Sequence, residues 1–524
     1  MMLLLAAAFS VVQSQHAHPA PPASTAILEV AQRPVALRTG IGAAHDTIGT
    51  SSKDAQAFYD QGLAYLHSYV WLEAARSFQQ ALRADPKLAI AYGRLSLMYT
   101  ELNAPAAARE AIERAKTMAS SATPHDRRHL DLELLRWAAE ASPQDPSKLL
   151  AYRAALDAAL VAFPDDEELW LARGLAESND PAERGQGSGT GSVRFYQKAA
   201  ALAPGHFAAH HYMAHAYENT ARMDAALLEG RTYATLAPNV PHARHMHGHS
   251  LRRTGRVDEA IAEFTAADSL ETAYFKAERI PVEYDWHYQH NLDLLGTSFQ
   301  YIGQMAQAEA RLKASFAITS SLLQQEFNKR EWPAFLLARG RVKEALDAAA
   351  VMTAHRSPVI SAAGHVAAGE ARLAQGELKA AVDEANTALR LIRGVEAGGL
   401  VATPLQALQG AFLLRTGQKE KGRSTIEGVV RKVRALPGPD NWTQALFTLE
   451  ALARTARDAG EWDLADWIAQ QMREHDPNYA GTHYALGLVA QHKGDTAASR
   501  KAFDLAKRYW SKADADLPEL KRIQ

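Results

Sequence analysis

The hydrophobic positions of this chain recur with the spacing of helices and with a period of about 34 residues. In the segment that begins at residue 55, small residues stand at Gly62 and Ala74, and large ones stand at Tyr65 and Phe78. Two antiparallel helices need small residues where they cross and large residues to fill the gap between them. Pro86 then ends the second helix. The spacing therefore predicts one helix pair per repeat.

The same frame recurs from residues 207 and 241, and glycines mark later turns at Gly340, Gly376, Gly417, Gly460 and Gly494. This pattern resembles the tetratricopeptide repeat (TPR). The resemblance implies an all-α fold, an α-solenoid that forms a right-handed superhelix of about ten helix pairs over roughly residues 51–510. Stacking of neighbouring repeats buries the apolar face that one repeat alone leaves open. The repeat markers weaken near 320–360, which predicts an N-terminal TPR solenoid over 51–320 and a C-terminal TPR-like solenoid over 321–524.

The N-terminal fifty residues differ from the repeats. Residues 1–12 are apolar but too short to span a bilayer, which predicts a signal peptide over 1–14. Residues 15–50 contain several Pro and Gly and are expected to form a linker or an arm. We therefore expect an exported protein, periplasmic or extracellular, with no integral membrane segment after signal cleavage.

The composition of the chain excludes several kinds of catalytic and binding site. The chain of 524 residues has no cysteine, which excludes disulfides, a cysteine nucleophile and thiolate metal sites. Its formal charge is −2, without a basic run, so we expect no nucleic-acid partner. The sequence contains no GxSxG, HExxH or GxGxxG motif, and no organic cofactor is expected.

The distribution of histidine along the chain is uneven and points to a functional site. The chain has 21 His, and ten of them lie in residues 206–290. In a TPR solenoid the first helix of each pair lines the concave face, and the resemblance implies that positions 2, 5, 9, 12 and 13 of the repeat face inward. Six imidazoles fall at positions 2, 5 and 9 of three successive repeats: His211, His215, His242, His245, His249 and His290.

This spacing suits a metal site in the concave groove. His211 and His215, like His245 and His249, are separated by four residues and share a helix face. Helical His pairs supply half of many transition-metal sites, and packed helices lie about 8–10 Å apart. All-nitrogen ligation favours Zn, Cu, Fe or Ni over Ca or Mg. Three further residues are candidates for a supporting or acid–base role: Glu218, Asp293 and His287.

Other interpretations of the histidines stay open. Arg252 and Arg253 fall at inward positions 12 and 13, which favours a groove that binds anionic groups or a peptide. His210 and His247 fall at positions expected to pack between helices. His125 and His129 start a helix and are expected to lie on a solvated face.

Four sequence blocks resemble secreted bacterial TPR proteins that share a His-bearing middle: 60–78, 184–218, 241–261 and 290–304. Their HHYxxHxxE and HxxHMxxH motifs correspond here to His210, His211, Tyr212, His215 and Glu218, and to His242, His245, Met246 and His249. The resemblance implies a site in this region without naming its chemistry. His247-Gly248 departs from the family pattern, which puts the ligand set in doubt.

Two classes of function follow. The first is an exported TPR scaffold that binds a protein or peptide partner in its concave groove and carries a His-rich transition-metal site there. The second is a metal-dependent enzyme, hydrolytic or oxidative, that uses the same histidines with Glu218 or Asp293 as acid or base. Repeat solenoids mostly bind partners, whereas a peptide groove does not need six imidazoles. Whether the protein is an enzyme stays open from sequence.

Overall fold

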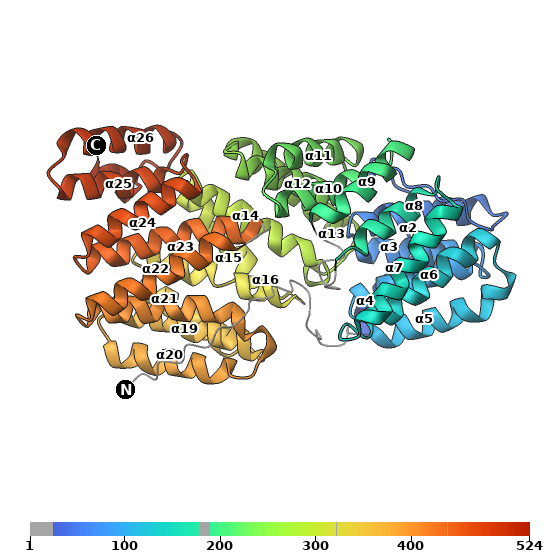
Figure 1. Cartoon of the computed structure of the whole chain (residues 1–524), viewed down its shortest axis with the longest axis horizontal. Coiled ribbons are helices and arrows are strands. Elements are labelled where there is room, and N and C mark those ends of the chain that lie inside the picture. The colour runs from blue at the N-terminus through green and yellow to red at the C-terminus, as the bar shows by residue number, and fades with distance from the viewer. Residues whose placement is uncertain (1–24, 179–188, 321, 437–438, 524) are drawn as a thin grey trace. The chain divides into compact units, whose positions relative to one another are not determined.

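A computed structural model describes residues 25–178, 189–320, 322–436 and 439–523. The predicted signal peptide over 1–14 lies outside these ranges. Within them the chain is helical, and consecutive helices pack as pairs (Figure 1). The predicted all-α, TPR-type solenoid is thereby confirmed. The chain forms two compact units that meet in sequence between Asn291 and Leu292.

The N-terminal unit contains the helices up to the first part of α14. Their bounds are α1 (Thr25–Ala31), α2 (Lys53–His67), α3 (Trp71–Ala84), α4 (Ala89–Glu101), α5 (Pro105–Met118), η1 (Ala119–Ser121), α6 (Pro124–Glu140), α7 (Pro146–Ala162), α8 (Glu167–Leu175), α9 (Thr190–Leu202), α10 (Ala208–Asn219), α11 (Met223–Leu236), α12 (Pro241–Arg253), α13 (Val257–Glu278), η3 (Val282–Tyr284) and α14 (Trp286–Tyr301).

The C-terminal unit continues from the second part of α14. Its helices are α15 (Met305–Ala317), α16 (Leu323–Asn328), α17 (Glu331–Ala338), α18 (Val342–Thr353), α19 (Pro358–Ala374), α20 (Leu378–Ile392), η4 (Glu396–Gly398), α21 (Gly399–Arg415), α22 (Lys419–Ala435), α23 (Pro439–Asp458), α24 (Trp462–His475), α25 (Ala480–His492), α26 (Thr496–Tyr509) and α27 (Pro518–Arg522).

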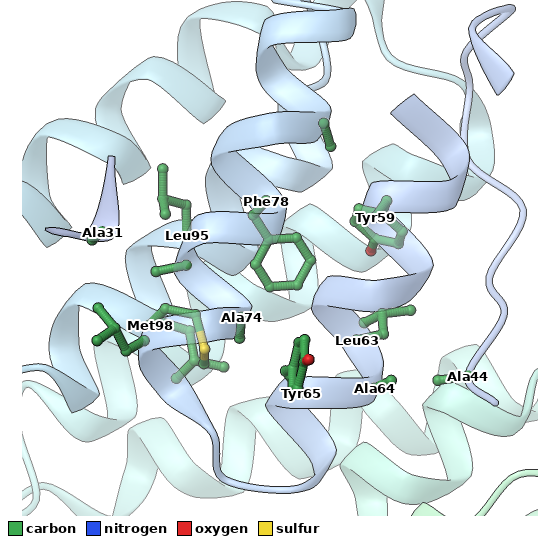
Figure 2. Packing of buried hydrophobic residues seen from close by; sticks show 14 of the residues in the cluster. Ala31, Ala44, Tyr59, Leu63, Ala64, Tyr65, Ala74, Phe78, Leu95 and Met98 are labelled. Atoms are coloured by element: carbon green, nitrogen blue, oxygen red, sulfur yellow. The ribbon is translucent and has the colours of Figure 1, made fainter. Parts of the chain in front are cut away.

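A glycine on the first helix of a pair receives a large side chain from the second helix, 16 residues later. A Cβ at Gly62 would lie 2.5 Å from the Phe78 ring, and a Cβ at Gly248 would lie 2.6 Å from Phe264. Figure 2 shows the Phe78 ring held between α2 and α3 in this way. In these pairs the close approach at the glycine sets the crossing point of the two helices, as the sequence pattern predicted.

The turns between paired helices use the left-handed backbone region. The five later glycines that were predicted to mark turns have φ between 72° and 79°: Gly340, Gly376, Gly417, Gly460 and Gly494. Glycine adopts this region without steric cost. At three such turns nearer the N-terminus a residue other than glycine takes up a similar value: Tyr69, Asn103 and Ala221.

Residues 25–50 form a docked arm. Ile27, Ile41 and Ile48 are buried in the helical unit. The backbone N–H of Asn239 donates to the Gly40 carbonyl over 2.8 Å. The arm therefore contacts residues far along the sequence. None of the helices in the described ranges is long and apolar enough to cross a membrane.

We predict opposite effects from alanine at two helical glycines of the C-terminal unit. A Cβ at Gly487 would lie 2.3 Å from the Phe503 ring, so Gly487→Ala is expected to destabilise the protein by about 1–3 kcal/mol. A Cβ at Gly428 meets no atom within 4 Å, so Gly428→Ala is expected to stabilise it by about 1 kcal/mol. Thermal unfolding followed by circular dichroism measures both, and equal shifts would contradict the proposed crossing contact.

Candidate metal centre

The six predicted histidines gather into two groups in the N-terminal unit. The first His group contains His211 and His215 of α10 and His242 of α12, and the second contains His245 and His249 of α12 and His290 of α14. Within each group the three candidate ligand atoms lie within 4.8 Å of one another. The structure thus brings together two three-His groups.

The two groups use the same repeat positions, and the second group lies one repeat further along the chain. Each uses repeat positions 5 and 9 of one inner helix and position 2 of the next inner helix. The spacing of four residues places each pair on one helix face, and the stacking of the next repeat supplies the third ring. Repeat packing therefore generates the second group in the same way as the first.

In the first His group three imidazole nitrogens lie close enough together to bind one metal ion. Nε2 of His211 lies 3.0 Å from Nε2 of His242 and 3.1 Å from Nε2 of His215. Three nitrogens around a tetrahedral ion at the usual metal–nitrogen distance would lie about 3.3 Å apart. Nδ1 of His211 donates to the carbonyl of His67 over 2.6 Å, which leaves the Nε2 lone pair facing the other two rings.

The second His group is oriented by side chains. Nδ1 of His245 donates over 2.9 Å to Oδ1 of Asn291, whose amide nitrogen donates to the Phe264 carbonyl. Nδ1 of His249 lies 3.3 Å from Oε2 of Glu218 and donates to it. The two Nε2 atoms, 2.7 Å apart, then face each other with lone pairs. Such lone pairs repel unless a proton or a metal ion lies between them.

Burial favours the neutral form of three of these rings, His211, His242 and His245. Five of the six histidines are 0–7% exposed, and His290 is half-buried. Burial, reinforced by neighbouring imidazoles, lowers the pKa of His211, His242 and His245 well below the usual value. The neutral imidazole is the form that binds a metal. Side chains this deeply buried do not offer a surface that a peptide can contact.

Glu218 supports the second His group. It is 2% exposed. Burial raises its pKa, but His249, Arg253 and His215 outweigh burial and leave the pKa below its ordinary value. An ionised carboxylate behind His249 fixes the ring and increases its basicity as a ligand.

The ring of Tyr69 packs on the first His group, and the backbone of Tyr69 is strained. Its ring centroid lies 4.6 Å from that of His211 and 5.4 Å from that of His242. Its φ is 57° at the turn position where a later repeat has Gly255. A bulky residue in this region costs about 1–2 kcal/mol. Trp286 donates its indole N–H to the Tyr69 carbonyl over 2.9 Å, which helps to hold the strained turn.

His287 lies between the two groups. Its ring centroid is 4.9 Å from His242 and 4.3 Å from His245, and its Nδ1 lies 2.5 Å from Oε1 of Glu271. Burial, with Asp285 and Asp268 nearby, raises the pKa of Glu271 well above its usual value. Nε2 of His287 is buried without a hydrogen-bond partner among the described residues. Depending on the tautomer, this nitrogen can donate or accept a hydrogen bond there.

The remaining candidates are members of neither His group. Asp293 is buried on α14 but belongs to the C-terminal unit and is in none of the three-ligand groups of the described ranges. His247 and His210 are half-buried and pair with Glu263 and Glu229. The expectation of a solvated face is wrong for His129, which is buried against Asp166.

Sequence reasoning missed a further buried group of His67, Glu168 and His206. Nε2 of His67 lies 3.0 Å and Nε2 of His206 lies 3.1 Å from Oε1 of Glu168. Glu168 occupies position 2 of its repeat, as His242 and His290 do, and that shared position is the signal that points to it. The group holds His67 in place, and the His67 carbonyl in turn orients His211.

No protein-family model and no curated protein matches this chain. The crystal structure of the APC/C hetero-tetramer Cut9-Hcn1 contains a chain 15% identical, with 90% of this chain and 76% of that chain covered and a TM-score of 0.30. The human IFIT1 dimer with PPP-AAAA is 12% identical, with 86% and 89% covered and a TM-score of 0.34. The human IFIT1 dimer with m7Gppp-AAAA is 12% identical, with 89% and 92% covered and a TM-score of 0.34. Likenesses at this level carry no argument about what this chain binds.

We predict that Tyr69→Gly destabilises the N-terminal unit although it removes backbone strain. Loss of a buried aromatic ring costs about 3–5 kcal/mol, more than the roughly 1–2 kcal/mol of strain that is relieved. Ala221→Gly is the matched control, since Ala221 has φ 57° but is exposed and is expected to gain up to about 1 kcal/mol. Unfolding curves in which both variants behave alike would contradict the packing of Tyr69 on the His group.

Proposed function

We propose that this chain is an exported TPR scaffold that binds two transition-metal ions, one in each three-His group. The convergence of three imidazole nitrogens in each group is the observation that carries the proposal. The hydrogen bonds from Nδ1 of His211, His245 and His249 support it, because they turn the free lone pairs toward the centre of each group.

The donor set indicates the class of metal. Imidazole nitrogen suits Zn, Cu, Fe and Ni, whereas Ca and Mg prefer oxygen ligands. Neighbouring helices lie about 8–10 Å apart, and one repeat separates the two groups. We therefore expect two separate ions rather than one pair bridged at about 3.5–4 Å.

A metal-dependent enzyme, hydrolytic or oxidative, is the second candidate. Three protein ligands leave a fourth position that a water or a substrate can take, as in catalytic metal sites. A bound ion would polarise that ligand, and His287, with Glu271 behind it, can take or give a proton nearby. The unpartnered Nε2 of His287 is the observation that favours this candidate.

A protein or peptide partner also belongs to the proposal, because repeat solenoids mostly act by binding. Five of the six histidines are buried, so such a partner would contact other surfaces of the solenoid. Export rests on the apolar N-terminal segment alone. Detection of the mature N-terminus after expression in a secreting host tests that part separately.

We predict that each His group loses one ion when one of its ligands is removed. Untagged protein is loaded with Zn²⁺, freed of weakly bound metal and analysed by elemental mass spectrometry. His211→Ala and His245→Ala are each expected to bind one ion fewer than wild type, and the double variant two fewer. His247→Ala is the control, because its ring pairs with Glu263 outside both groups. Unchanged stoichiometry in both single variants would contradict the proposal.

We predict that Glu218→Gln weakens metal binding in the second His group alone. Loss of a carboxylate behind a ligating imidazole costs about 10–100-fold in affinity. A chelator competition assay measures the affinity of the ion that is lost in His245→Ala. Glu229→Gln, which alters a His–Glu pair at His210, is the control and should leave that affinity unchanged. An equal loss in both variants would mean that Glu218 acts through general stability.

A further inference from the structure

A cluster of a different composition lies where the N-terminal arm crosses α6. Asp46 of the arm meets His125 and His129, which are separated by four residues on α6. Each offers one ligand atom, and the three atoms lie within 4.8 Å of one another. The two imidazole rings are adjacent, with centroids 4.5 Å apart. None of these residues takes part in the two His groups.

The His125 ring is held in the orientation of a metal ligand. Its Nε2 lies 2.8 Å from Oδ1 of Asp46, and its Nδ1 lies 3.0 Å from Oδ1 of Asp126. Asp126 is fixed in turn, since the backbone N–H of Gly49 donates to its Oδ2 over 2.9 Å. A carboxylate behind the ring is the usual support of a metal-binding imidazole.

Asp46 supplies an unsatisfied oxygen at this cluster. The residue is 7% exposed, and its Oδ2 is buried without a hydrogen-bond partner among the described residues. A buried carboxylate oxygen without a partner is unfavourable. Nε2 of His129 lies 2.9 Å from Oδ2 of Asp166, which brings a second carboxylate to the edge of the cluster.

We infer that Asp46, His125 and His129 form a third cation site, which takes a divalent ion of the Zn²⁺ class and fastens the arm to α6. Two imidazole nitrogens with one or two carboxylate oxygens are a common ligand set for zinc. The mixed donors distinguish this site from the all-nitrogen His groups, and the inference does not depend on the function proposed for those groups.

An ion at this site would hold the N-terminal arm against α6. Asp46 comes from the arm, whereas both histidines come from α6, so one ion joins segments about 80 residues apart. An ion that binds only the docked arm stabilises that state by mass action. The competing arrangement is a protonated His125 between Asp46 and Asp126 with no ion, which leaves Oδ2 of Asp46 without a partner.

Zinc stoichiometry tests the site directly. The untagged His211→Ala/His245→Ala variant is expected to retain one Zn²⁺ per chain, and addition of Asp46→Asn is expected to remove it. Asp46→Asn alone, in the otherwise wild-type chain, should lower the number of bound ions by one. His45→Ala, which alters an exposed neighbour that pairs with Asp60, is the control and should keep the ion.

Protection of the arm gives a second readout. Arg38 is an exposed tryptic site in the arm. Zn²⁺ is expected to slow cleavage there roughly tenfold in wild type and in His45→Ala, but not in Asp46→Asn. Retention of the ion by Asp46→Asn, or cleavage that does not respond to Zn²⁺ in wild type, would overturn the inference. Failure of the two His groups would instead appear as unchanged stoichiometry in His211→Ala and His245→Ala.

Discussion

The arrangement of the two His groups depends on hydrogen bonds made by the outer nitrogens of three histidines, His211, His245 and His249. Nδ1 of His211 donates to a backbone carbonyl, and Nδ1 of His245 donates to an amide oxygen that is itself fixed. Each bond selects the tautomer whose Nε2 lone pair faces inward. Without these acceptors for the Nδ1 atoms, the buried imidazoles would donate hydrogen bonds to one another. Their Nε2 lone pairs would then not need to face a common point.

Repeat architecture explains why there are two groups. A His pair at positions 5 and 9 needs one more ring, and position 2 of the following repeat lies beside it. Stacking neighbouring repeats brings these positions together each time they carry His. At the next inner helix, position 5 is Asp293 and position 9 is Thr297, so the series ends with His290. A short sequence motif that recurs in successive repeats thus gives two neighbouring His groups.

The repeat frame alone predicted much of this centre. It assigned the six histidines to three neighbouring inner helices. Glu218, one turn beyond His215, was predicted as a further ligand, a supporting residue or an acid–base group, and the structure shows only that its carboxylate accepts from His249. It did not predict the contacts that close the centre, because they join distant parts of the chain. His67 and Tyr69 lie more than 140 residues from His211, and neither carries a sequence mark of that contact. The packing of Tyr69 on His211 and His242 was likewise not visible from the repeat frame.

Metal-edge anomalous diffraction from crystals soaked in Zn²⁺ shows whether metal ions occupy the two His groups. We expect one strong peak in each His group, about 2.0–2.1 Å from three imidazole nitrogens, at His211, His215 and His242 in the first group and at His245, His249 and His290 in the second. Anomalous density at exposed histidines such as His45, with none inside either group, would contradict it.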